Sequence, residues 1–89
     1  MTINYEQLPE HIRDGMRRYV ESGIEPGSFL TAVLCNDLMR AIGVADEINR
    51  ARLWDICAFL YNEAPSTCFG SVEAFQSWTQ RGGLEERRK

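Results

Sequence analysis

Apolar residues recur along this chain at three- and four-residue spacing, which is the period of an α-helix. In the first such segment, residues 9–22, four of them form a single stripe: Ile12, Met16, Tyr19 and Val20. Proline is favoured in the first helical turn, where Pro9 stands, and glycine is common just after a helix ends, where Gly23 stands. We therefore predict an amphipathic helix from Pro9 to Ser22.

A second helix is predicted from Phe29 to Ile42, after the turn signal in residues 24–27. Ser28 is expected to cap its start, because a serine hydroxyl accepts a hydrogen bond from a free backbone N–H. Apolar side chains surround nearly the whole helix, which is typical of a central helix or of one that faces a second subunit. The pattern therefore allows a homo-oligomer in which the apolar second helix forms the contact between subunits.

Two more helices complete the prediction. The third starts at the cap residue Asp46 and runs to Glu63 or Ala64, because Pro65 pushes the preceding residue out of helical conformation. The fourth runs from Val72 to Gln80, between a cap at Ser71 and the glycines at positions 82 and 83.

The pattern thus predicts an all-α fold: a compact bundle of three principal helices and a short fourth C-terminal helix. Residues 1–83 are expected to form a single helical domain, and residues 84–89 a charged mobile tail. The core is expected to contain Leu30, Val33, Leu34, Leu38, Leu53, Ile56 and Leu60.

Composition and charge narrow the function. With 44% hydrophobic residues among 89, the chain resembles an ordinary globular domain. Residues 1–80 hold six basic and eleven acidic side chains, a net charge of −5, which argues against nucleic-acid binding and favours a basic partner. No apolar run approaches the roughly 20 residues that a membrane span needs.

The inventory of reactive side chains is small. Cys35, Cys57 and Cys68 accompany a single histidine, His11, and no C-x-x-C spacing occurs. Cys35 and Cys57 fall in apolar helical stretches, and an odd number of cysteines favours a reducing, cytoplasmic setting. No nucleophile–base pair or local set of metal ligands is evident, so we expect no catalytic residues, no metal, no cofactor and no enzymatic activity.

One candidate anion-binding site lies at the predicted start of the second helix. The backbone N–H groups after Gly27 and Ser28 could hold a phosphate or carboxylate there, with Arg13 or Arg17 of the first helix completing the site. The segment lacks the spacing of a nucleotide-binding loop, and ordinary helix capping explains the same residues.

Candidate partner-binding residues fall into two groups. Asn36 and Asp37 interrupt the most apolar helix, where Asp37 could face a partner or pair with Arg50 or Arg52. The second group gathers aromatic and polar residues at the end of the third helix and in the loop after it: Tyr61, Asn62, Glu63 and Phe69. Aromatic residues on loops are often binding anchors, although they also close the ends of small bundles.

Two strings carry a family resemblance: GIEPGSFLTAVLCNDL at residues 23–38 and LYNEAPSTCFGS at residues 60–71. Together with LPEH at residues 8–11, they resemble a family of small uncharacterised helical proteins encoded by bacteriophages and prophages. The resemblance covers about residues 8–83. The family commonly has Trp in place of Phe69 and Pro in place of Val72, so this chain departs from it at both positions. The resemblance implies the cytoplasm of a bacterial host as the setting, but no established activity and no functional residue.

Three functions follow as hypotheses. The first is a small non-enzymatic phage-type accessory protein that binds and inhibits or modulates a host protein or defence system, or binds a phage protein. The second is an oligomeric sponge for an anionic signalling nucleotide, with anion sites at the start of the second helix. The third is a DNA-binding regulator, which the acidic body opposes.

Overall fold

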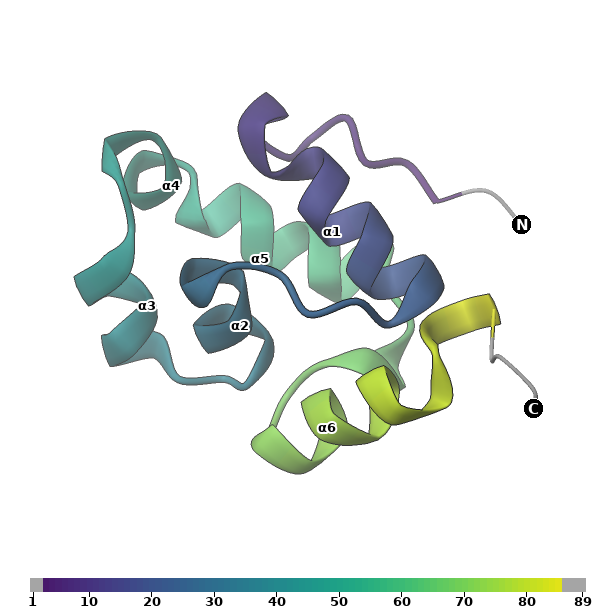
Figure 1. Cartoon of the computed structure of the whole chain (residues 1–89). Helices are drawn as coiled ribbons and strands as arrows, with labels where there is room; N and C mark the ends of the chain where they lie inside the picture. Colours follow the sequence, from purple (N-terminus) through teal and green to yellow (C-terminus); the bar gives the residue numbers. More distant parts are fainter. Residues whose placement is uncertain (1–2, 86–89) are drawn as a thin grey trace.

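The computed structural model describes residues 3–85, and these residues form helices without any strand. Figure 1 shows the arrangement, with α2 near the centre and α3 and α4 together at one end. In chain order the helices are α1 (Glu10–Ser22), α2 (Ser28–Leu34), α3 (Leu38–Val44), α4 (Glu47–Ala51), α5 (Leu53–Asn62) and α6 (Val72–Arg81). Two short 3-10 turns, η1 (Ser66–Cys68) and η2 (Gly83–Glu85), flank α6. The all-α fold class is confirmed.

The first and last predicted helices are found almost where the sequence places them. The predicted stripe on α1 is buried, and Gly23 ends the helix with φ 71°, in the left-handed region that glycine adopts without strain. α6 starts at Ser71, whose Oγ accepts a hydrogen bond from the backbone N–H of Ala74 at 3.0 Å, and ends at left-handed Gly82. Both helices thus end at a glycine in left-handed conformation, and α6 also begins at a serine N-cap.

The predicted second helix is instead two helices. The chain leaves α2 after Leu34, and Asn36 takes φ 63°, a left-handed conformation that asparagine tolerates better than most residues. Asp37 then caps α3, because its side chain accepts a hydrogen bond from the backbone N–H of Arg40. The prediction that Ser28 caps this helix is wrong. Gly27 is the N-cap residue of α2, and no side chain caps the helix start.

The predicted third helix is also divided, between α4 and α5. Arg52 stands at the junction with φ −107° and ψ 15°, outside helical geometry. Its guanidinium donates to the Gln7 carbonyl at 2.7 Å and to the Asp55 carboxylate at 2.6 Å. The N-terminal segment is therefore docked against the junction. The predicted three-plus-one bundle is not confirmed, since residues 3–85 form six helices.

The core draws on nearly every element and on the N-terminal segment. Tyr5 and Leu8, which precede α1, are buried in the same cluster as the apolar faces of α1, α2, α5 and α6. Of the predicted core residues, Leu30, Leu34, Ile56 and Leu60 are buried, and Val33 and Leu53 are partly buried against the cluster. The prediction for Leu38 is wrong: its side chain is 54% exposed, because the break at Asn36 turns α3 away from the axis of α2.

The C-terminal turn closes the fold against α1. Trp78 of α6 is buried, and its indole N–H donates to the backbone carbonyls of Tyr19 and Val20 near the end of α1. η2 packs on the same end, where the Ser22 hydroxyl donates to the Glu85 carboxylate at 3.0 Å. The predicted tail over residues 84–89 begins within this turn, and its residues 86–89 lie outside the described residues.

Candidate functional site

Three of the predicted partner-binding residues line a single apolar groove. Asn36, at the α2–α3 break, is far in the sequence from the other two, which are Tyr61 at the end of α5 and Phe69 in the loop that follows. The groove has a volume of about 350 Å³, and the residues that line it are Val33, Asn36, Cys57, Leu60, Tyr61, Phe69 and Gly70. We refer to it as the Tyr61 groove.

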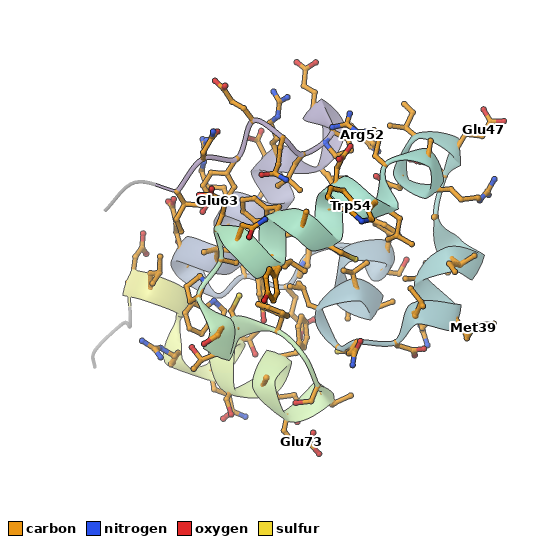
Figure 2. All side chains as sticks on the ribbon, turned by 180° about the vertical axis from the view of Figure 1, so that it is seen from behind. Met39, Glu47, Arg52, Trp54, Glu63 and Glu73 are labelled. Atoms are coloured by element: carbon orange, nitrogen blue, oxygen red, sulfur yellow. The ribbon has the colours of Figure 1, made fainter. Side chains whose placement is uncertain are left out.

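The Tyr61 groove lies beside unusually exposed apolar side chains. Tyr61 is 84% exposed. Trp54, which is labelled in Figure 2 and lies two turns earlier on the same face of α5, is 79% exposed. A smaller hollow shares Val33, Asn36 and Cys57 with the groove and extends it toward Leu38 of α3. Exposed aromatic side chains beside an apolar groove are typical of a protein-docking surface.

The other predicted partner-binding residues lie around the groove rather than in it. Asp37 lines the smaller hollow while its carboxylate caps α3. The proposed ion pairs from Asp37 to Arg50 or Arg52 are not formed, since Arg50 donates to the Ala45 carbonyl and Arg52 pairs with Asp55. Asn62 is exposed as the last residue of α5.

Glu63, the last member of that set, follows Asn62 and is half-buried. Its carboxylate accepts a hydrogen bond from the backbone N–H of Asn4 at 3.4 Å. Glu63 thus helps to fasten the N-terminal segment to the end of α5 and does not line the Tyr61 groove.

The predicted anion site is not assembled. Arg13 donates to the backbone carbonyls of Leu8 and Glu6, and the Arg17 guanidinium lies 5.0 Å from the centre of the Tyr5 ring. Both arginines therefore fasten the N-terminal segment to α1. Gly27 lines a pocket next to α1, but the arginine there is Arg18.

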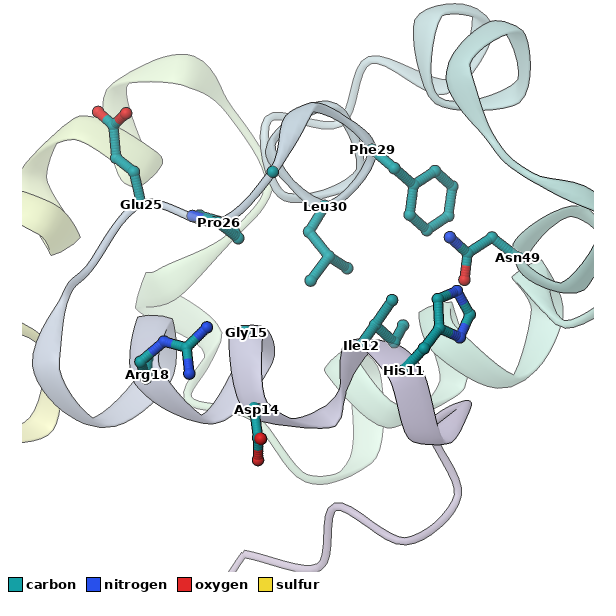
Figure 3. Close-up of a pocket in the computed structure, with 11 residues that line it drawn as sticks. His11, Ile12, Asp14, Gly15, Arg18, Glu25, Pro26, Phe29, Leu30 and Asn49 are labelled. Carbon is teal, nitrogen blue, oxygen red and sulfur yellow. The ribbon is translucent and has the colours of Figure 1, made fainter.

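This pocket, which sequence reasoning missed, lies between α1 and the start of α2 (Figure 3). Its volume is about 530 Å³, and Ile12, Phe29 and Leu30 give it apolar walls. Asn49 of α4 lines one end and is only 4% exposed, yet its side-chain oxygen has no hydrogen-bond partner. We refer to this hollow as the Asn49 pocket.

Polar contacts hold the Asn49 end of this pocket in place. The Asp46 carboxylate caps α4 by accepting from the backbone N–H of Asn49 at 2.7 Å, and it also contacts His11 of α1 at 3.0 Å. These hydrogen bonds hold the pKa of Asp46 below its usual range. No sequence signal marks Asn49 as buried, because it stands among the charged residues of the segment 46–50.

The thiol of Cys68 is buried in the core. Burial raises the pKa of the Cys68 thiol to about 12, so it stays protonated at neutral pH and is a poor nucleophile. Among residues 3–85, no group of three or more His, Cys, Asp or Glu side chains is placed to hold a metal ion.

Cys57 and Cys68 are expected to differ in reactivity. A thiol-specific reagent should modify exposed Cys57 in the folded protein and leave Cys68 unmodified, because Cys68 is fully buried and protonated. Mass spectrometry of the partly modified protein after peptide digestion measures both sites. Full modification in denaturant is the control, and fast native modification of Cys68 would contradict its burial.

Comparison with known proteins adds no relative. No protein family, curated protein or solved structure matches the chain. Within the part that the structure describes, no helix combines the length and apolar character needed to cross a membrane. Over residues 3–85 the structure is all-helical, and its hollows include the Tyr61 groove and the Asn49 pocket.

Proposed function

We propose that this chain is a small non-enzymatic accessory protein that acts by binding another protein in the Tyr61 groove. The observation that carries the proposal is the convergence of Asn36, Tyr61 and Phe69 on one apolar groove, with Tyr61 itself 84% exposed. An aromatic side chain that stands in water beside a groove gains by burial against a partner, and such residues dominate the energy of many interfaces.

The charge of the chain favours a partner with a basic surface. Residues 1–80 carry a net charge of −5, and Asp37 lies at the hollow that continues the groove. Opposite charge around an apolar contact speeds association and suppresses wrong partners. A second copy of this chain carries the same acidic charge, so the groove suits a different, basic protein better than itself.

The comparisons found no family for this chain. A bacterial host protein as the partner, such as an enzyme or a component of a defence system, is therefore proposed from the sequence resemblance of residues 8–83 to bacteriophage and prophage proteins alone. A small protein without a catalytic set acts on such a target by covering a functional surface. The partner is then expected to contribute apolar side chains to the groove and Lys or Arg side chains around it.

The test is affinity purification of the tagged protein from a bacterial lysate at low salt, followed by binding measurements with the captured protein. Tyr61→Ala is expected to weaken binding at least tenfold, because truncating a central aromatic anchor costs about 2 kcal/mol or more. Its thermal stability should hardly change, since the side chain is exposed.

The matched control is Ile24→Ala, which removes an exposed apolar side chain in the α1–α2 connection, away from the groove. It should bind as the unmodified protein does, and binding of both should weaken as salt rises. Equal affinity of Tyr61→Ala and the unmodified protein would contradict the proposal. A homo-oligomer in native mass spectrometry that Tyr61→Ala dissociates would assign the groove to self-association instead.

A further inference from the structure

One face of α5 is exposed to solvent along the length of the helix. Its exposed side chains include Trp54, Cys57 and Tyr61, which stand at positions i, i+3 and i+7 and therefore share one side of the helix. Figure 2 views the molecule from this side: α5 crosses the front between Arg52 and Glu63, and no other described helix is drawn over it. The opposite face of α5 is buried in the core.

The Tyr61 groove and the smaller hollow beside it follow this exposed face. Cys57 lines both of them, so the two hollows are continuous along α5. The residues of α5 that line them, together with Trp54, fall within about a third of the helix circumference; they are Leu53, Trp54, Cys57, Leu60 and Tyr61. A rise of 1.5 Å per residue places Trp54 and Tyr61 about 10 Å apart along the axis, the length of two helical turns.

The far wall of the groove is held in place by hydrogen bonds. Phe69 stands between two of them: the backbone N–H of Gly70 donates to the Leu34 carbonyl at 2.8 Å, and the Tyr19 hydroxyl donates to the Cys68 carbonyl at 2.6 Å. These bonds tie the loop to the end of α2 and to α1. A groove that is already formed costs little conformational entropy when a partner binds.

The segments that border the groove carry negative charge. Residues 33–38 and 53–73 contain four carboxylates and no Lys or Arg; the carboxylates are Asp37, Asp55, Glu63 and Glu73. The nearest cations in the sequence are Arg40 and Arg52, and Arg52 is paired with Asp55. An apolar segment flanked by Lys or Arg therefore complements this surface.

We propose that the partner occupies the Tyr61 groove as an amphipathic helix, which lies along α5 across Trp54 and Tyr61 and carries Lys or Arg on both sides of its apolar stripe. The assignment rests on the proposed function, protein binding in this groove, and adds the form of the bound segment. Strand addition needs an open sheet edge, and residues 3–85 contain no strand. A helix presents apolar side chains at i, i+3, i+4 and i+7, which match the two-turn length of the exposed face.

The probe is a synthetic peptide of about 14 residues, or roughly four turns, with leucines three and four residues apart along one face and lysines elsewhere. Its control has the same leucines and lysines in alternation, the period of a strand, so composition and charge are equal. Fluorescence anisotropy with the full chain should show at least tenfold tighter binding of the helical-period peptide, and circular dichroism should show a gain of helix on binding. Equal affinities, no binding of either peptide at millimolar concentration, or tighter binding of a proline-rich peptide would overturn the proposal.

Two substitutions on the exposed face locate the peptide. Trp54→Ala and Tyr61→Ala should each weaken binding of the helical-period peptide at least tenfold, because each removes an aromatic anchor. Both side chains are exposed, so neither change should unfold the protein. Ile24→Ala, in the α1–α2 connection, should leave the affinity unchanged. Equal affinity of Trp54→Ala and the unmodified protein would contradict a helix lying along α5.

The protein captured from the bacterial lysate separates this assignment from the proposed function. If Tyr61→Ala weakens its binding and Trp54→Ala does not, the partner occupies the groove without lying along α5, and only the helical form is overturned. If neither substitution changes its binding, both proposals fail. A homodimer in analytical ultracentrifugation that Trp54→Ala dissociates would assign the exposed face of α5 to a second copy of the chain and overturn the helical partner.

Discussion

Replacing Trp78 by alanine is expected to lower the free energy of unfolding by about 3–5 kcal/mol, the usual cost of truncating a large buried aromatic side chain. Trp78 is 2% exposed, and its indole N–H donates to the carbonyls of Tyr19 at 3.0 Å and Val20 at 3.2 Å. The substitution therefore opens a cavity and leaves two carbonyls at the end of α1 without this donor. Small domains have only about 5–15 kcal/mol of stability, so this loss removes a large fraction of it.

Urea denaturation followed by far-ultraviolet circular dichroism measures this effect. Trp54→Ala is the matched control, because Trp54 is 79% exposed and its loss should change the free energy of unfolding by less than about 0.5 kcal/mol. Trp78→Phe is expected to fall between the two, since it keeps part of the packing and loses the donor. A Trp78→Ala variant as stable as Trp54→Ala would show that α6 does not pack on α1 in this way.

The elements that the sequence predicts well are those with marked ends. α1 and α6 have an apolar stripe, a left-handed glycine at the C-terminal end and, for α6, a serine cap at the start. Each of these signals depends on only a few neighbouring residues, so it can be recognised in the sequence without knowledge of the rest of the chain.

The two breaks were missed for different reasons. Asn36 and Asp37 do mark a boundary, since asparagine tolerates positive φ and aspartate caps helices, but the continuous apolar pattern outweighed them. Arg52 carries no such local signal. Its junction coincides with hydrogen bonds to Gln7 and Asp55, and a contact over 45 residues is not readable from local pattern.

The site residues also divide into those that local sequence predicts and those that depend on long-range contacts. Tyr61 and Phe69 were predicted as anchors from residue type alone, and the fold brings them to one groove with Asn36. The roles of the arginines are harder to predict. Arg13, Arg17 and Arg18 all lie on α1, and the side of the helix from which each projects decides which one lines the Asn49 pocket. Predicting these positions requires knowing that the N-terminal segment packs on α1 and contacts Arg13 and Arg17.

The second large effect is expected at Gly83, where Ala should lower the free energy of unfolding by about 2–5 kcal/mol, from backbone strain and overpacking together. Gly83 has φ 70°, which L side chains rarely adopt. A Cβ there would stand 2.6 Å from the backbone nitrogen of Gly23 and 2.7 Å from the carbonyl carbon of Glu21. Since these are backbone atoms at the end of α1, no side chain can move aside, and η2 must separate from α1.

Gly43→Ala is the matched control for this substitution. Gly43 lies inside α3 with no atom within 4 Å of a built Cβ, so alanine there should raise the free energy of unfolding by about 0.5–1 kcal/mol through higher helix propensity. Both variants add the same methyl group, and the sign of the change in urea midpoint is expected to differ between them. If Gly83→Ala were as stable as the unmodified protein, the close approach of η2 to the end of α1 would be absent in solution, and the hydrogen bond between Ser22 and Glu85 would be lost with it.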